Sequence, residues 1–257
     1  MMFRTALPAM LGVLVAMASS SFAANQDKRV YEMRVYYAPE GKLEELNARF
    51  RNHTLKLFEK HGMTNVGYWQ PLGDNPQRKL VYFLAYPSRE AREVSWKAFM
   101  ADPEWQKAYK ASEVNGKLVE RVESVFFQAA DYSPEIQPDA QGERVFELRT
   151  YTTTPGNLGA LHDRFRNHTV ALFAKHGMTN VAYWSPMQDQ PGSEDTLLYI
   201  LAHKSPEAAK ASFDAFRQDP EWVAARAASE KKAGGSLTTP DGVKSEFLQA
   251  TDYSPIR

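Results

Sequence analysis

The sequence predicts an α+β protein of two ferredoxin-like β-α-β-β-α-β repeats, packed sheet to sheet as one barrel within a single chain. Three observations support this prediction. The chain contains an internal duplication, both copies show the same order of strand and helix patterns, and each copy has a sheet face that its own helices do not cover. Because two such faces in one chain can cover each other, we expect the two sheets to meet.

The duplication is visible as short blocks of identical residues. The spacing between matching blocks grows along the chain, so short insertions separate them, as is typical of loops between fixed elements. We expect a first repeat at 28–134, a linker rich in Pro, Asp and Gln at 135–142, and a second repeat at 143–257. The matching blocks are 49–54 with 164–169, 61–65 with 176–180, 102–105 with 219–222, and 131–134 with 252–255.

Residue periodicity predicts the order of elements in the first repeat. Alternation over 30–37 indicates a strand, whereas leucine and phenylalanine recur at helical spacing over 41–60, before Gly62 in the position of a C-terminal cap. Ser88 and Asp102 are expected to cap two further helices, and proline follows Asp102 in the first turn. The remaining strands are expected at 66–70, 80–86 and 122–129, and the second repeat shows each element again.

Alternation along the first strand assigns its two faces. Tyr31 and Val35 belong to a mostly apolar set that we expect to face the helices, so Glu32, Arg34 and Tyr36 are expected to point into the space between the two sheets. A buried Glu–Arg pair is either a structural ion pair or a polar patch in a ligand cavity, and both interpretations stay open. The candidate ligand-binding residues are Glu32, Arg34, Tyr36, Tyr68 and Trp69, with Glu147, Arg149, Tyr151, Tyr183 and Trp184 in the second repeat.

Two histidines are candidate catalytic residues. His53 falls in a stripe with Leu46, Phe50 and Leu57, which predicts that it faces the sheet, and His168 has the matching place in the second repeat. Each is a candidate general base or haem ligand, and the alternative is a structural imidazole at the edge of the core. No histidine or carboxylate stands four residues away to complete a metal pair, so we expect no metal site; no motif indicates a cofactor, haem included.

Other aromatic and basic side chains of the helices are expected to be structural. Aromatic residues at helical spacing are interpreted as helix core, and the paired arginines around the histidine stripe as a solvated face. The aromatic set is Trp96, Phe99, Trp105 and Tyr109, and the basic set is Arg49, Arg51, Arg164 and Arg166.

Composition excludes several kinds of chemistry. Lys plus Arg equals Asp plus Glu at 31 each, so no basic excess indicates a nucleic acid partner. The chain has no cysteine, which excludes disulfides, thiolate nucleophiles and cysteine-ligated zinc.

The start of the chain resembles an export signal. Arg4 precedes an apolar stretch at 7–18 that is too short to span a bilayer, and small residues at Ser21 and Ala23 predict a signal peptide over 1–23. The alternative is a retained membrane anchor. With the signal cleaved, we expect a secreted or periplasmic protein that has no contact with the membrane.

Both repeats carry the same set of short motifs, which in the first repeat are Tyr31 to Tyr36, Phe50, His53, Phe58, 61–63, 66–69, Trp96, Phe99 and 102–105. Together these motifs resemble the NIPSNAP family. That resemblance implies the dimeric α+β barrel superfamily, which includes cofactor-independent monooxygenases, lactone isomerases, haem-binding enzymes and stress-response proteins. It implies no single reaction, and the eukaryotic members look mitochondrial and are tied to signalling and protein interaction. This chain departs from them in its export signal and its two domains.

Three functional hypotheses follow. The first is a protein that binds a small apolar or aromatic molecule in the barrel cavity, oriented by the strand Arg and Glu residues. The second is a cofactor-independent oxygenase or isomerase, with His53 or His168 as base and a strand Arg stabilising an oxyanion. The third is a protein-interaction module, which predicts a barrel filled by its own side chains. Assembly into a homo-oligomer is compatible with each hypothesis.

Overall fold

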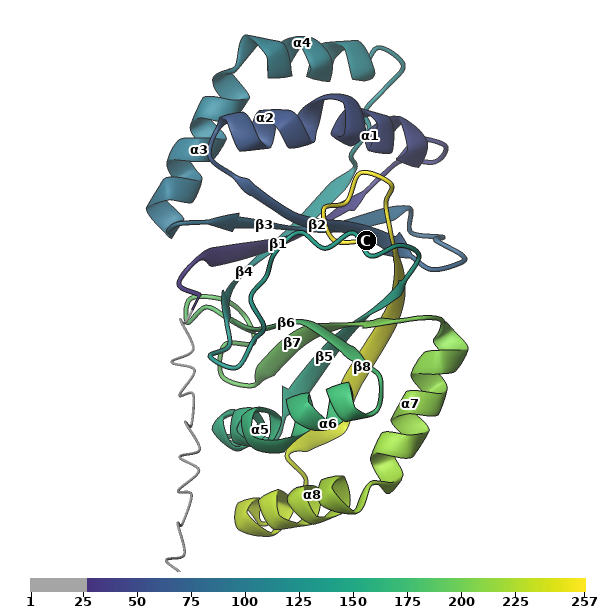
Figure 1. Cartoon of the computed structure of the whole chain (residues 1–257). Helices are drawn as coiled ribbons and strands as arrows, with labels where there is room; N and C mark the ends of the chain where they lie inside the picture. The colour runs from purple at the N-terminus through teal and green to yellow at the C-terminus, as the bar shows by residue number, and fades with distance from the viewer. Residues whose placement is uncertain (1–26) are drawn as a thin grey trace, which may run out of the picture.

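The computed structural model describes residues 27–257, and in this part of the chain eight antiparallel strands close into a barrel between two layers of helices (Figure 1). The predicted signal peptide, residues 1–23, lies outside the described residues. Within residues 27–257 no helix has the length and apolar character needed to cross a bilayer.

Each repeat folds in the predicted β-α-β-β-α-β order, with the first helical segment interrupted by a π turn (η) and the second divided in two. The elements of the first repeat are β1 Val30–Tyr37, α1 Leu43–Arg49, η1 Phe50–Thr54, α2 Leu55–Lys60, β2 Thr64–Pro71, β3 Lys79–Tyr86, α3 Arg89–Ala101, α4 Pro103–Ser112 and β4 Arg121–Ala129. Those of the second repeat are β5 Val145–Thr153, α5 Leu158–Arg164, η2 Phe165–Thr169, α6 Val170–Lys175, β6 Thr179–Pro186, β7 Thr196–His203, α7 Pro206–Gln218, α8 Pro220–Ala233 and β8 Thr238–Ala250.

The barrel is made of two four-stranded sheets joined at two seams. The strand order is β4-β1-β3-β2 in the first repeat and β8-β5-β7-β6 in the second, and all neighbours are antiparallel. Trp69 on β2 pairs with Ala250 on β8, and Phe127 on β4 pairs with Pro186 on β6. The last strand of each repeat therefore completes the sheet of the other, which confirms the predicted sheet-to-sheet barrel.

The barrel interior is an apolar core built from both repeats. Tyr31 and Val35 of β1 belong to it, with Phe146 of β5, and the Phe83 ring stacks on Trp184 at 4.6 Å between centroids. The face assignment of the first strand was therefore wrong. The apolar set points into the barrel, whereas the polar rows Glu32, Arg34, Tyr36 and Glu147, Arg149, Tyr151 point towards the helices. The physical reason is that apolar side chains from both sheets pack against each other in the interior, while the sheet–helix layer supplies partners for the ion pairs.

A π turn in each first helix decides which residues face the sheet. In η1, Phe50 and Thr54 are buried, and the Thr54 hydroxyl donates to the carbonyl of Arg49, five residues back, at 3.1 Å. The extra residue of the wide turn shifts the helical phase, so His53 is exposed. The prediction that His53 and His168 face the sheet was wrong for this reason: Thr54 and Thr169 are buried in their place, and His168 is only half-buried.

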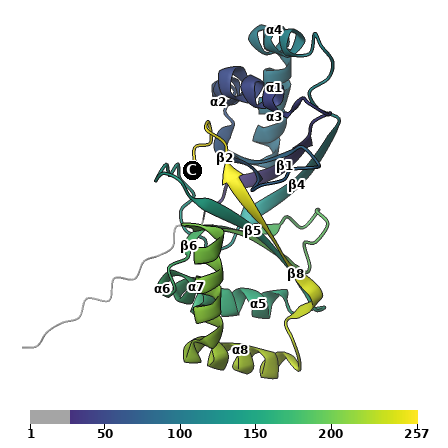
Figure 2. The same cartoon turned by 90° about the vertical axis from the view of Figure 1, so that its right-hand side faces the viewer.

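The C-terminal segments of the two repeats are exchanged, and Figure 2 shows β8 rising from the second repeat to end beside β2. Asp252 binds Arg51 of the first repeat through two hydrogen bonds of 2.6 and 2.8 Å, and the Ser254 hydroxyl accepts from the Tyr68 amide at 2.9 Å. The first repeat does the same in reverse, through Asp131 with Arg166 and Ser133 with Tyr183. The repeated Asp-Tyr-Ser-Pro block is therefore a clasp between the halves.

Candidate ligand pocket in the first repeat

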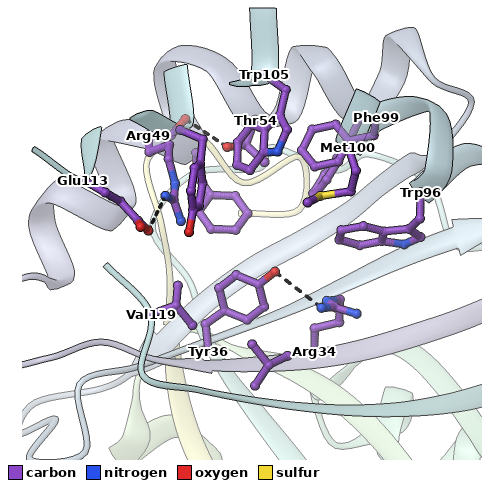
Figure 3. A pocket seen from close by; sticks show the side chains of 14 residues that line it. Arg34, Tyr36, Arg49, Thr54, Trp96, Phe99, Met100, Trp105, Glu113 and Val119 are labelled. Atoms are coloured by element: carbon purple, nitrogen blue, oxygen red, sulfur yellow. Dashed lines mark hydrogen bonds and ion pairs between the residues drawn. The ribbon is translucent and has the colours of Figure 1, made fainter. Parts of the chain in front are cut away.

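A pocket of about 280 Å³ lies between the sheet of the first repeat and its helices (Figure 3). Arg34 and Tyr36 of β1 form its floor, the π turn η1 lies along one side, and α3 and α4 provide the remaining walls. We call this cavity the first-repeat pocket. Its aromatic lining consists of Tyr36, Phe50, Phe58, Trp96, Phe99, Trp105 and Tyr109.

Beneath the pocket a buried cluster of Glu32, Arg34 and Arg92 forms what we call the polar floor. The Glu32 carboxylate is fully buried and accepts from Arg92 at 2.9 and 3.0 Å, and it also forms an ion pair with Arg34. Ser124 donates to the same carboxylate at 2.7 Å and the Tyr86 hydroxyl at 3.0 Å. Burial alone would raise the pKa of Glu32, but the hydrogen bonds from Arg92 and Ser124 and the charges of both arginines lower it to about 2. Glu32 is therefore ionised near neutral pH and holds both guanidinium groups in place.

The polar floor also fixes the Trp96 ring that forms one wall. The Trp96 Nε1 group donates to the Tyr86 hydroxyl at 2.8 Å. The guanidinium groups of Arg34 and Arg92 lie 4.5 and 5.2 Å from its ring centroid, within the range of cation–π attraction. Because both ring and cations are held by the Glu32 cluster, this wall is ordered before any ligand arrives.

At the other end of the pocket Arg49 pairs with Glu113. Its Nη1 atom donates to Glu113 at 3.0 Å and to Ser112 at 3.3 Å, and its guanidinium lies 5.4 and 5.2 Å from the rings of Trp105 and Tyr109. Burial would raise the pKa of Glu113, but hydrogen bonds from Tyr109 and Arg49 outweigh it and lower that pKa. The first-repeat pocket thus has an arginine at each end and aromatic rings between.

The mouth of the pocket exposes apolar side chains to solvent. Met100, Tyr109 and Val122 line the cavity and are 54%, 41% and 43% exposed. Large apolar residues at this exposure around an opening are typical of an entrance for an apolar ligand.

Comparison with known proteins places the chain in a family. The NIPSNAP family model matches residues 31–134 and 146–255, one match for each repeat. This chain belongs to the NIPSNAP family. A NIPSNAP domain protein of known structure from Burkholderia xenovorans is 25% identical, the match covering 41% of this chain and 99% of that one, with a TM-score of 0.36.

Two solved structures that cover most of this NIPSNAP chain share its fold. A putative monooxygenase from Lactobacillus acidophilus is 11% identical over 89% of this chain and 98% of its own, with a TM-score of 0.53. A putative monooxygenase from Fusobacterium nucleatum is 9% identical over 86% and 92%, with a TM-score of 0.55. At these identities the likeness confirms the dimeric α+β barrel fold and carries no information on activity. None of the curated proteins matches the sequence.

The residues predicted to form one site in the NIPSNAP chain are divided among three places. Arg34 and Tyr36 line the first-repeat pocket, and Glu32 lies in its floor. Tyr68 packs on Tyr82 in the same sheet–helix layer. The set Glu147, Arg149, Tyr151 and Tyr183 forms the matching layer of the second repeat, whereas Trp69 and Trp184 lie in the barrel interior.

The predicted catalytic histidines do not join these groups. Neither His53 nor His168 lines the first-repeat pocket; His53 is exposed and His168 is half-buried. A different histidine, His203, does contact the polar row of the second repeat, with its Nε2 atom 3.2 Å from the Glu147 carboxylate. In the first repeat Tyr86 has this place, and its hydroxyl donates to Glu32.

Sequence reasoning missed Arg49 as a pocket residue. It was interpreted as solvated, yet its side chain is only 4% exposed. Its carboxylate partner Glu113 is 64 positions away, at the C-cap of α4. The interpretation of Trp96, Trp105 and Tyr109 as helix core was incomplete, because they also line the cavity. The signal that was available is the unchanged recurrence of Arg49 as Arg164 in the block that carries the π turn.

The second repeat rebuilds the pocket surroundings with different residues. Ala209 takes the place of Arg92, so Glu147 keeps Arg149 as its arginine partner and gains His203. The aligned pocket positions differ too: Phe213 for Trp96, Arg217 for Met100 and Arg226 for Tyr109. The two repeats therefore share a framework but present different chemistry to a ligand.

Proposed function

We propose that this NIPSNAP protein binds a small aromatic or apolar molecule in the first-repeat pocket. The pocket has the composition of a ligand site, with aromatic walls and a few fixed polar groups. Its volume of about 280 Å³ lies just below the usual range of ligand cavities, roughly 300–1,000 Å³, so the ligand must be compact.

The observation that carries the proposal is the apolar mouth. Met100, Tyr109 and Val122 leave water-exposed apolar surface at the opening, and this arrangement costs free energy in the absence of a ligand. A ligand that enters between them removes this surface from water and reaches rings already held in place by the polar floor.

The alternative of an oxygenase or isomerase lacks the histidine base that it requires at this site. The carboxylate that lines the pocket, Glu113, is a weak base, because hydrogen bonds from Tyr109 and Arg49 lower its pKa. The ionisable groups that line the pocket are Arg34, Arg49, Glu113 and two tyrosines, and neither candidate histidine is among them. We therefore propose ligand binding rather than proton transfer as the function of the first-repeat pocket.

A pair of matched valines tests this proposal. Val122 at the mouth is 43% exposed, and Val243, its counterpart in the second repeat, is 45% exposed. We expect Val122→Trp to cover the mouth and to abolish the binding of neutral naphthalene-2-carboxamide, measured by isothermal titration calorimetry. Val243→Trp adds the same bulk on the second repeat and is expected to leave binding unchanged. Equal binding by both variants would contradict the proposal.

A further inference from the structure

The free edge of Arg49 indicates which chemical group the ligand carries. Both hydrogen bonds that Arg49 forms with described side chains use Nη1. Its Nε atom is buried and has no hydrogen-bond partner within residues 27–257. The Arg49 side chain is only 4% exposed and lines the first-repeat pocket. A guanidinium offers donors in a planar fork, and the Nε–Nη2 edge is one of the two edges that can bind a carboxylate side-on.

Two other arginines of the same helices show how this fold fills that edge. Arg51, two residues from Arg49, binds the oxygens of Asp252 through Nε and Nη2 at 2.6 and 2.8 Å. Arg166 binds Asp131 in the same way, at 2.8 Å for both bonds. In both arginines of the clasp, therefore, an aspartate of the chain binds the Nε–Nη2 edge. Arg49 has the same edge, but no carboxylate of the described residues binds it.

The second repeat preserves the unpartnered atom although its surroundings have changed. Arg164, the counterpart of Arg49, also has a buried Nε that no described residue binds. The Glu230 carboxylate lies 3.9 Å from Nη1 of Arg164, and the same carboxylate oxygen accepts a hydrogen bond of 2.9 Å from Nε of Arg226. An unpartnered buried donor costs free energy, yet both repeats leave this edge of the arginine without a protein partner among the described residues. In the first repeat the arginine lines the pocket, so the edge is placed to serve a ligand there.

The charges around the first-repeat pocket favour a monoanion. Arg34, Arg49 and Arg92 are balanced by two buried or half-buried carboxylates, Glu32 and Glu113, which leaves one positive charge in excess. The exposed Glu93 also contacts Arg92, but water screens that pair. We infer that the ligand is a small aromatic carboxylic acid, whose carboxylate is bound side-on by Nε and Nη2 of Arg49. This inference depends on the proposed function, because it names the ligand class of the same pocket.

The experiment compares two ligands of nearly the same shape that differ in charge. Calorimetry with 2-naphthoate and with naphthalene-2-carboxamide at pH 7 is expected to show roughly tenfold tighter binding of the acid, as is typical of one charge-assisted pair of hydrogen bonds. Arg49→Gln is expected to remove this preference and to keep the binding of the amide, which also shows that the variant is folded. Arg51→Gln, in the same helix but with its edge filled by Asp252, is the control and should keep the preference.

The outcomes separate the inference from the proposed function. If the wild-type protein binds the acid no tighter than the amide, or if Arg49→Gln keeps the preference, the inference is wrong and the proposed function stands. If neither compound binds, the proposed function fails as well. Should Arg49→Gln fail to fold, Arg49→Lys keeps the positive charge without the planar edge, and it must lose most of the preference for the inference to hold.

Discussion

Glu32 organises the first-repeat pocket although it does not line it. Its carboxylate receives hydrogen bonds from Arg92, Ser124 and Tyr86 and pairs with Arg34. Its loss would leave the buried guanidinium of Arg34 and the half-buried one of Arg92 without their shared anion. The cost of removing one partner from a buried ion pair exceeds the net value of the pair itself, because the remaining charges stay desolvated.

We expect Glu32→Gln to lower the free energy of unfolding by about 3 kcal/mol at pH 7, measured by urea denaturation. Glu147→Gln is the matched control in the second repeat, and a smaller loss is expected there because Glu147 has one arginine partner fewer. Equal losses in the two variants would contradict the role given to Arg92.

The Glu32 carboxylate also predicts that the free energy of unfolding depends on pH. The pKa of Glu32 is lowered to about 2 in the folded protein, so its stabilising contribution is present above the pKa of the unfolded chain, near 4.5. That contribution is lost as the pH falls from about 4.5 towards 2. The difference in unfolding free energy between the wild-type protein and Glu32→Gln should therefore shrink over this range, and a constant difference would contradict the assignment.

At the scale of single elements, the order of helices and strands could be predicted but the faces could not. Periodicity located β1 and the first helix, and Ser88 and Asp102 cap helices as expected, their side chains accepting from Ala91 and Glu104. The face of β1 was assigned wrongly because alternation shows which residues share a face of the strand. It does not show which face points into the barrel interior and which towards the helices. The barrel interior and the sheet–helix layer are both buried. The polar row lies in the sheet–helix layer, where Arg92 is an additional partner for Glu32.

The π turn explains why the candidate histidines were misplaced. An α-helical stripe through Phe50 predicts that His53 faces the sheet, but the wide turn places Thr54 there. No residue pattern available from one sequence signals an extra residue in a helical turn. The same turn begins directly after Arg49, so the residue that completes the first-repeat pocket was missed along with it.

At the scale of the whole molecule, the two repeats depend on each other. Each last strand closes the partner sheet, and each Asp-Tyr-Ser-Pro segment clasps the other half, with Tyr253 stacked on Phe50 at 6.3 Å between centroids. Phe50 also lines the first-repeat pocket, so the end of the second repeat supports the ligand site of the first.

Removal of residues 252–257 is expected to destabilise the protein by about 3 kcal/mol, because it uncovers Phe50 and leaves the buried amide of Tyr68 without its Ser254 acceptor. Thermal unfolding followed by circular dichroism measures the effect. Asp252→Asn weakens only the exposed ion pair with Arg51, so a loss below about 1 kcal/mol is expected from it. If the single substitution costs as much as the truncation, the packing of Tyr253 and Ser254 is not what holds the halves together.

The position of a bound ligand tests the central claim that the site lies between sheet and helices, outside the barrel interior. Crystals of the protein soaked with 6-bromo-2-naphthoate would locate the bromine by its anomalous scattering. We expect the bromine in the first-repeat pocket, within contact of Trp96 or Phe99, with the carboxylate on Arg49. A bromine between Trp69 and Trp184 inside the barrel would contradict it.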